Sequence, residues 1–289
     1  MNKLMLNKYK KFIDEAKVYD VAKRTPLDYQ ALLSSRLNNQ IYLKREDLQS
    51  VFSFKIRGAY NKLIHLDEET RSKGVIAASA GNHAQGVAMA AKTLGCKAII
   101  VMPKTTPSIK TNAVRKHGAE VILHGISLFE SLELAHKIEK DQGLTFIHPF
   151  DDPHVIAGQG TIGKEILEDF KDPIHAIFVC VGGGGLISGI AAYVKSVNPK
   201  IKIIGVEAKD SEAMTQALKK NERISLDQVS LFAEGAAVKQ IGVHNFEIVT
   251  QCVDEMIVVD NDEICAAIKD VFEDTRTVLE PAGALAAAG

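Results

Sequence analysis

The sequence predicts an α/β protein built on parallel sheets. Short runs rich in Val, Ile and Ala alternate with helical patterns along almost the whole chain. Strands that are separated by helices pair in parallel through right-handed crossovers, and both faces of their sheet are covered. Hydrophobic residues make up 46% and charged residues 25% of the chain, which is ordinary for a globular protein with a sizeable core.

The expected elements begin with a charged amphipathic helix over residues 1–16, because no uninterrupted apolar run follows its lysines as in a signal peptide. Strand-like runs then lie at 74–79, 97–103, 119–125, 144–150, 175–181, 201–208 and 254–260. Helical patterns lie between them at 83–94, 107–117, 128–140 and 186–197. The final residues, EPAGALAAAG, look like the start of a helix, so we expect a truncated chain.

Charge and cysteine patterns argue against several classes of function. The 35 basic and 36 acidic residues are spread along the chain, and the net charge is −1, which gives no support to a nucleic-acid or membrane partner. The four cysteines form no CxxC pair, so free thiols in the cytoplasm are expected. No apolar run reaches ~18 residues. The nine histidines show no metal-ligand spacing, so we predict no metal site.

The segment GQGTIG, residues 158–163, satisfies GxGxxG and is followed by Lys164. A dinucleotide site needs a strand that runs into the first glycine, and a P-loop needs Ser or Thr after the lysine. The preceding segment is DDPHVIA, and Glu165 follows the lysine. We therefore predict a helix whose glycines allow close packing, and no nucleotide site.

A second glycine run, Gly182 to Gly185, lies between a convincing strand and a helix. Several bare N–H groups at the carboxyl end of a parallel strand, beside a helix N-terminus, suit a phosphate. One or two glycines would suffice for a tight turn. Phosphate binding is therefore the favoured interpretation.

The segment SAGNHAQG, residues 79–86, also lies between a strand and a helix. Its small residues let backbone amides approach a ligand, and Asn82 and His83 add side-chain donors. A carboxylate fits this place, although a polar helix cap would use the same residues.

Lys55 stands in the partly apolar segment SFKIRGAY, where a surface helix with an extended lysine is the ordinary explanation. Together with a phosphate site and a carboxylate site, Lys55 has a second, functional explanation. A pyridoxal 5'-phosphate enzyme needs an anchor, a substrate site and an amine that forms a Schiff base. Desolvation lowers the pKa of such an amine and makes it a nucleophile.

Five ordered segments resemble the threonine dehydratases (threonine deaminases), which are tryptophan-synthase-β-like, fold type II pyridoxal phosphate enzymes. These segments are SFKIRGA, SAGNHAQG, VGGGGLISG, LFAEGAAVKQIG and FEDTRTVLEPAGALA. The resemblance runs from about Thr25 to Gly289, and LFAEGAAVKQIG is closer to the isoleucine-biosynthetic form than to the catabolic one. It implies a lyase that dehydrates L-threonine.

The resemblance also implies roles for individual residues. Lys55 would be the catalytic Schiff-base lysine, Phe54 would pack near the cofactor ring, and Glu280 would lie near the ring. Asn82 would hydrogen-bond the 3-oxygen of the ring. The phosphate would be held by Gly182, Gly183, Gly184, Gly185 and Leu186, and the substrate carboxylate by Ser79, Ala80, Gly81, Asn82 and His83.

The family fold implies two α/β lobes with the cofactor between them. Residues 1–67 and 151–289 would form the larger, cofactor-binding lobe, and residues 68–150 the smaller, inserted one, with no regulatory domain present. Lys55 would remove the α-proton of threonine, the β-hydroxyl would leave, and 2-oxobutanoate and ammonia would result. L-Serine would give pyruvate, and a homo-oligomer, a dimer or tetramer, is expected.

Two departures from the family keep alternatives open. Related serine racemases carry a serine as a second acid or base where this chain has Ala80, so racemisation should be poor. Those relatives also bind a divalent ion through acidic residues after the GVE strand. Glu207 is present here, but Ala213 stands at the later position, which weakens that site. The chain ends before a serine that partners the pyridine nitrogen. A serine dehydratase or racemase, and a truncated chain that binds cofactor without turnover, remain alternatives to the threonine dehydratase.

Overall fold

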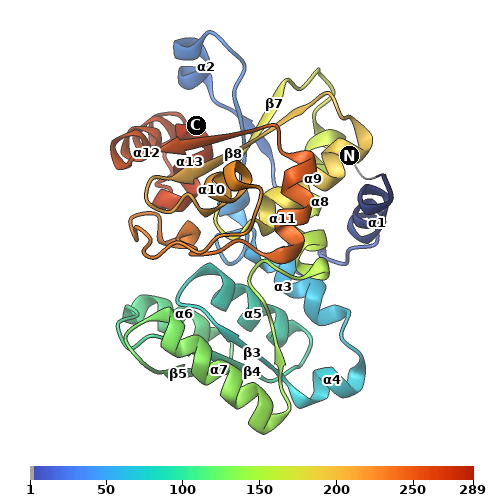
Figure 1. Cartoon of the computed structure of the whole chain (residues 1–289), viewed down its shortest axis with the longest axis vertical. Helices are drawn as coiled ribbons and strands as arrows, with labels where there is room; N and C mark the ends of the chain where they lie inside the picture. The colour runs from blue at the N-terminus through green and yellow to red at the C-terminus, as the bar shows by residue number, and fades with distance from the viewer. Residues whose placement is uncertain (1–2) are drawn as a thin grey trace. The chain divides into compact units, whose positions relative to one another are not determined.

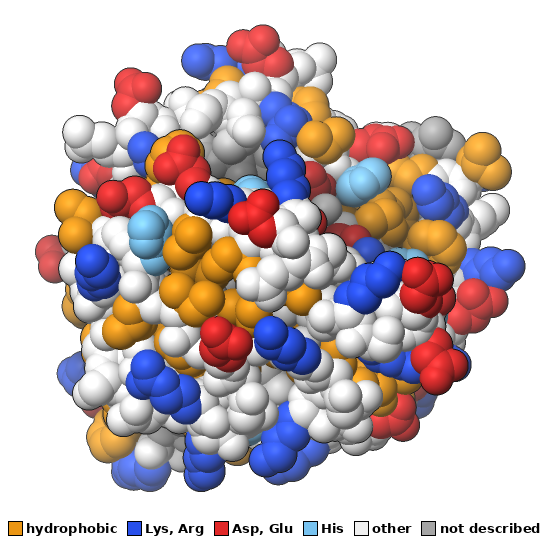
Figure 2. Space-filling model, turned by 90° about the horizontal axis from the view of Figure 1, so that it is seen from below, with side chains coloured by type: hydrophobic (Ala, Val, Ile, Leu, Met, Phe, Trp, Pro, Cys, Tyr) orange, Lys and Arg blue, Asp and Glu red, His pale blue; other side chains and the backbone are white. Residues whose placement is uncertain are grey.

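The computed structural model describes residues 3–289 and confirms the α/β class (Figure 1). The chain forms two compact units. Unit 1 contains the chain up to Glu15, Arg24–Arg45 and Phe150–Gly289, and unit 2 contains Ala16–Lys23 and Glu46–Pro149. Among the described helices, none has the length and apolar character to cross a membrane. Figure 2 shows positive and negative side chains interspersed over one face, in keeping with the balanced charge.

Unit 2 is built on a parallel sheet with the strand order β5-β4-β3-β6. Its strands are β3 (Val75–Ala78), β4 (Ala98–Met102), β5 (Glu120–Leu123) and β6 (Thr145–Phe146). Its helices are α3 (Lys55–Ile64), α4 (Glu68–Lys73), α5 (Asn82–Thr93), α6 (Ser108–Lys116) and α7 (Leu128–Gln142), with a 3-10 turn η1 (Glu46–Leu48).

Alternate side chains of the strands in unit 2 enter two apolar layers, as the pleat of a sheet requires. Val75 and Ile100 pack with α3 and α5 in one layer. Ile76 and Ile99 pack with Ala135 of α7 in the other layer. In Figure 1, α5 and α7 accordingly cover opposite faces of this sheet. Both faces are therefore covered, as the sequence predicts.

Residues 46–67 pack in unit 2, whereas the sequence analysis assigns them to the larger lobe. The reason is the apolar face of α3, because Ile56, Ala59 and Leu63 are buried in the same layer as Val87 of α5. The compact units thus divide the chain at other residues than the expected lobes. The assignment of the lobes to cofactor binding stays a prediction.

Unit 1 is built on a parallel sheet with the strand order β7-β8-β9, formed by β7 (Ala176–Cys180), β8 (Lys202–Ala208) and β9 (Glu255–Val259). A separate antiparallel ribbon pairs β1 (Leu27–Tyr29) with β2 (Tyr42–Lys44), which the sequence analysis missed. The helices are α1 (Lys3–Asp14), α2 (Ala31–Leu37), α8 (Pro153–Asp169), α9 (Gly185–Val197), α10 (Ala213–Lys220), α11 (Val243–Cys252), α12 (Asn261–Thr275) and α13 (Pro281–Ala288), with a 3-10 turn η2 (Glu234–Ala236).

The segment GQGTIG lies inside α8, which confirms the prediction of a closely packed helix. A Cβ on Gly189 of α9 would lie 2.4 Å from the carbonyl oxygen of Ile156 and 2.6 Å from the nitrogen of Gly160. A Cβ on Gly163 would lie 3.2 Å from Ile190. The glycines let the two backbones touch, which is a packing role and not a nucleotide-binding one.

Candidate functional site

Lys55 is the first residue of α3, and its side chain is half-buried. Its Nζ donates a hydrogen bond to the carbonyl oxygen of Pro149 at 3.3 Å. The same atom lies 5.2 Å from the centre of the Phe54 ring, within the range of a cation–π contact. The amine is therefore held between a carbonyl and an aromatic face, as a reactive lysine beside a planar cofactor would need.

Ser79 to Gly81 link β3 to α5, which begins at Asn82, so the predicted strand–loop–helix arrangement is confirmed. The N–H of Gly81 donates to the hydroxyl of Ser79 at 3.3 Å. His83 is buried, and its Nε2 lies 2.8 Å from the carbonyl oxygen of Ile147. Because a carbonyl only accepts, this nitrogen carries the proton.

Burial, together with the nearby charge of Lys55, lowers the pKa of His83 to about 3. The imidazole is therefore neutral near pH 7. A neutral ring adds no positive charge for binding an anion. Its Nε2–H is also already bonded to the carbonyl oxygen of Ile147. The substrate-binding role of residues 79–83 stays a prediction. Groups of the loop other than the imidazole of His83 would have to provide it.

The start of α3 and the start of α5 lie against each other. A Cβ on Gly86 would lie 3.1 Å from the carbonyl carbon and oxygen of Lys55. The side chains of His83 and Lys55 both reach the short segment 147–149. Unit 2 thus brings Phe54, Lys55 and the first residues of α5 into one neighbourhood.

The second group of predicted residues lies in unit 1, where Gly182 to Gly184 connect β7 to α9. Gly184 has a φ of 98°, a conformation that favours glycine. Within residues 3–289, the backbone N–H groups of Gly183 to Ile187 donate to no other backbone group. The first N–H groups of a helix have no partner inside it and carry a partial positive charge. A phosphate fits this place.

All four glycines of this loop are closely packed. A Cβ on Gly182 would lie 2.9 Å from Ala236 of η2, and one on Gly183 would lie 2.3 Å from the Phe150 ring. A Cβ on Gly185 would lie 3.0 Å from the backbone of Phe150. Close packing therefore explains part of the glycine content that the sequence analysis assigned to a ligand alone.

Glu280 is the exposed N-cap residue of α13. A Cβ on Gly235 of η2 would lie 3.3 Å from Oε1 of Glu280, while Ala236 of the same turn adjoins Gly182. Glu280 and the glycine loop therefore both adjoin η2. Leu186, the second residue of α9, is half-buried directly after the loop.

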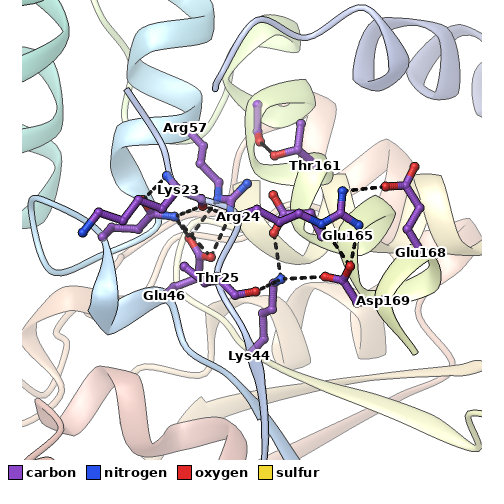
Figure 3. A network of polar contacts seen from close by, with 12 residues as sticks. Lys23, Arg24, Thr25, Lys44, Glu46, Arg57, Thr161, Glu165, Glu168 and Asp169 are labelled. Atoms are coloured by element: carbon purple, nitrogen blue, oxygen red, sulfur yellow. Dashed lines mark hydrogen bonds and ion pairs between the residues drawn. The ribbon is translucent and has the colours of Figure 1, made fainter. Parts of the chain in front are cut away.

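Arg57 was missed by the sequence analysis as a residue that supports Lys55. Its guanidinium is fully buried and donates to both carboxylate oxygens of Glu46 at 2.8 Å, and to the carbonyl oxygen of Lys23 at 3.0 Å (Figure 3). A planar two-point pair of this kind fixes orientation as well as position. It holds the first turn of α3, which carries Lys55. The only sequence signal is an arginine two residues after the lysine in an apolar segment.

A second buried ion pair lies in unit 1. Nζ of Lys44 lies 2.7 Å from Oε2 of Glu165, whose side chain is fully buried, and it donates to the carbonyl oxygen of Thr25 (Figure 3). Lys44 belongs to β2 and Glu165 to α8, so the pair joins the ribbon to the helix. Glu165, which argued against a P-loop in the sequence, therefore has a structural role.

Glu207, at the end of β8, is fully buried and accepts hydrogen bonds at 2.8 Å from the N–H groups of Met214 and Thr215. The hydroxyl of Thr215 donates to it at 2.7 Å. Burial raises the pKa of this carboxyl to about 7, although the hydrogen bonds oppose the shift. The start of α10 satisfies Glu207 where the resemblance places an ion-binding position in racemases.

The model of the family described as "Pyridoxal-phosphate dependent enzyme" matches residues 18–289. The chain is 57% identical over 284 residues to the protein named "L-threonine dehydratase biosynthetic IlvA" of Burkholderia multivorans, covering 97% of this chain and 56% of that protein. The chain spans about half the length of the curated relatives it matches.

Two solved structures are similar over 98% of this chain. The processed form of threonine deaminase isoform 2 from Solanum lycopersicum is 50% identical, with a TM-score of 0.96 and 78% of its chain covered. Maize serine racemase is 33% identical, with a TM-score of 0.91 and 84% covered. These similarities confirm the predicted fold type and cofactor class.

Proposed function

Because this chain belongs to the family of pyridoxal-phosphate dependent enzymes, we propose that it removes water from L-threonine to give 2-oxobutanoate and ammonia. The observation that carries the proposal is the amine of Lys55, half-buried between the Phe54 ring and the carbonyl of Pro149. The likeness to threonine deaminase from Solanum lycopersicum supports the choice of substrate. L-Serine, giving pyruvate, would be a side substrate, and the reaction would be the first step toward isoleucine.

The resemblance assigns cofactor-binding roles to residues of unit 1 and to residues of unit 2. The N–H groups after Gly182 and the N-terminus of α9 would hold the phosphate, with Leu186 closing the turn. Phe54 would pack near the ring, Asn82 would bond its 3-oxygen, and Glu280 would lie near it. When bound, pyridoxal phosphate supplies an electron sink for the charge that develops at the substrate α-carbon.

Lys55 would act twice. Its Nζ would hold the cofactor, and as a free amine it would take the α-proton of threonine. The segment Ser79 to His83 would hold the substrate carboxylate near the start of α5, through groups other than the N–H of Ser79, which donates to the carbonyl oxygen of Val101. The β-hydroxyl then leaves as water, and hydrolysis of the product returns one water and releases ammonia.

A serine dehydratase or racemase is the second candidate, and the likeness to maize serine racemase favours it. Racemisation needs a proton donor on the opposite face of the reacting carbon. The resemblance places that donor at the position of Ala80, whose methyl group has no proton to give. Dehydration is therefore the better supported reaction.

The proposed partners are a small amino acid and further copies of the same chain, in a dimer or tetramer, and the proposed location is the cytoplasm. The net charge of −1 and the interspersed charges of Figure 2 support the absence of a nucleic-acid partner. Size measurement of the purified protein by light scattering would test the oligomer.

The decisive experiment loads the chain with pyridoxal phosphate and measures keto-acid formation from L-threonine and L-serine. We expect formation from threonine that falls by about 10²–10⁴-fold or more in Lys55→Ala. Lys62→Ala, an alteration later in the same helix, is the control. Undiminished formation in Lys55→Ala would overturn the proposal. Cofactor binding with no formation at all would favour the alternative of a chain without turnover.

A further inference from the structure

Asn245 lies in the first turn of α11 and is completely buried. Its Nδ2 donates to the carbonyl oxygen of Gly183 at 3.0 Å and to that of Phe150 at 3.1 Å. Two carbonyl acceptors on one side fix the orientation of the carboxamide, because only the nitrogen can donate. The side chain therefore joins the glycine loop to Phe150, the first residue of the last segment of unit 1.

The same side chain has a buried Oδ1 with no hydrogen-bond partner among the described residues. An unpaired buried acceptor destabilises a protein, whereas an apolar side chain of the same shape would avoid the problem. A contribution to folding alone therefore does not account for an asparagine here. The two hydrogen bonds that Asn245 donates act instead on the glycine loop.

The carbonyl of Gly183 accepts a second bond, from the N–H of Gly242 at 3.2 Å. These two donors hold the carbonyl toward α11. In a trans peptide the carbonyl and the following N–H point in opposite directions. The N–H of Gly184 is consequently directed away from α11, and the φ of 98° at Gly184 then turns the chain into α9.

We propose that Asn245 is a positioning residue for a phosphate site formed by the glycine loop. By holding the carbonyl of Gly183 inward, it keeps the N–H groups of Gly184 and Gly185 available to an anion. The inference rests on the proposed function, because it takes the anion to be the phosphate of the cofactor. Asn245 touches neither the phosphate nor the reacting atoms and acts through the loop.

The packing around Asn245 supports a fixed geometry. A Cβ on Gly184 would lie 2.9 Å from Cβ of Asn245, and one on Gly242 would lie 2.5 Å from its Nδ2. Asp151 accepts hydrogen bonds from the N–H groups of Val243 and His244 at 2.8 and 2.9 Å, which anchors α11 beside the loop. The carboxamide therefore has little room to turn away from Gly183.

The test compares two ligands that differ only in the phosphate. Pyridoxal phosphate and pyridoxal are titrated separately into the cofactor-free chain, and binding is followed by absorbance. For Asn245→Leu, we expect the Kd for pyridoxal phosphate to rise about tenfold, as for the loss of one hydrogen bond. The Kd for pyridoxal should stay within about twofold.

Thr250→Val is the matched control, because Thr250 lies exposed on the same helix and bonds only to carbonyls of that helix. Circular dichroism checks folding, and Asn245→Ala replaces the leucine variant if the latter does not fold. Unchanged binding of pyridoxal phosphate by a folded variant would overturn the role of Asn245 alone. Equal weakening for both ligands would also overturn it, since the effect would not depend on phosphate. Failure of the unaltered chain to bind pyridoxal phosphate would overturn the proposed function as well.

Discussion

The glycine loop of unit 1 and the Ser79–His83 loop of unit 2 have the same place in their sheets. Each follows a parallel strand and leads into a helix. They differ in what surrounds them. Every glycine from 182 to 185 has a neighbouring atom within 3.0 Å of where a Cβ would stand, whereas a Cβ on Gly81 would meet nothing within 4 Å.

If the two loops bind the anions proposed above, this difference distinguishes two ways of binding them. The glycine loop offers only backbone groups, fixed by packing from Phe150, Ala236 and Asn245. The Ser79–His83 loop combines backbone groups with side chains and has open space beside Gly81. A fixed set of amides suits the constant phosphate of a cofactor, and an open loop suits a substrate that enters and leaves in each turnover.

Between the two loops, the largest effect on cofactor affinity is expected from Gly184→Ala. The new alanine would have to keep the positive φ of Gly184. Its Cβ would lie 2.9 Å from Asn245 and from Met214. Strain of this kind amounts to about 1–3 kcal/mol. We expect the affinity for pyridoxal phosphate to fall by about 10–100-fold, as measured by titration.

Gly81→Ala is the matched change in the other loop. Because the space is open, we expect affinity for the cofactor within about twofold of the unaltered chain. Its effect should instead be on the KM for threonine. If Gly81→Ala weakened cofactor binding as much as Gly184→Ala, the distinction between the two loops would be wrong.

The next effect concerns His83 and acid. In the unfolded chain the imidazole takes up a proton near pH 6.5, but burial lowers the folded pKa to about 3. Between these values the unfolded state binds one proton more. The free energy of unfolding therefore falls as the pH falls below about 6.5, by about 1.4 kcal/mol per pH unit from this group. Urea unfolding at several pH values should show that His83→Gln loses this contribution.

Glu207, which lies in unit 1, should give a pH dependence of the free energy of unfolding with the opposite sign. Its pKa rises from 4.5 to about 7, so the folded state binds the extra proton between these values. The contribution is present below pH 4.5 and is lost as the pH rises through 7. Glu207→Gln should flatten this dependence in the same urea series. A stability that rose with pH from this group would contradict the assignment.

The smallest effect on dehydration is expected from Ala80→Ser. The change adds one hydroxyl in a half-buried, open loop, so keto-acid formation from threonine should stay within about twofold. Chiral chromatography of L-serine incubations should instead detect D-serine in the variant. Equal amounts of D-serine from the variant and the unaltered chain would show that another group limits racemisation.

Much of the fold could be predicted, because the strands and helices around residues 74–86 and 175–197 follow clear periodicity. The position of the glycine loop between a strand and a helix could also be predicted, whereas the place of Lys55 at the start of α3 is known only from the structure. The buried pair of Arg57 and Glu46 could not, since charged residues are ordinarily exposed and their pairing depends on tertiary contacts. Asn245 was missed for the same reason, because its two acceptors come from distant parts of the sequence.

The contact between α8 and α9 has a consequence for how this gene can change. Any missense mutation in the codon of Gly189 inserts a carbon atom within 2.4 Å of the Ile156 carbonyl oxygen. No flexible side chain stands there to move aside, because the neighbours are backbone atoms of Ile156 and Gly160. That codon can vary only at its synonymous third base, unless the two helices separate.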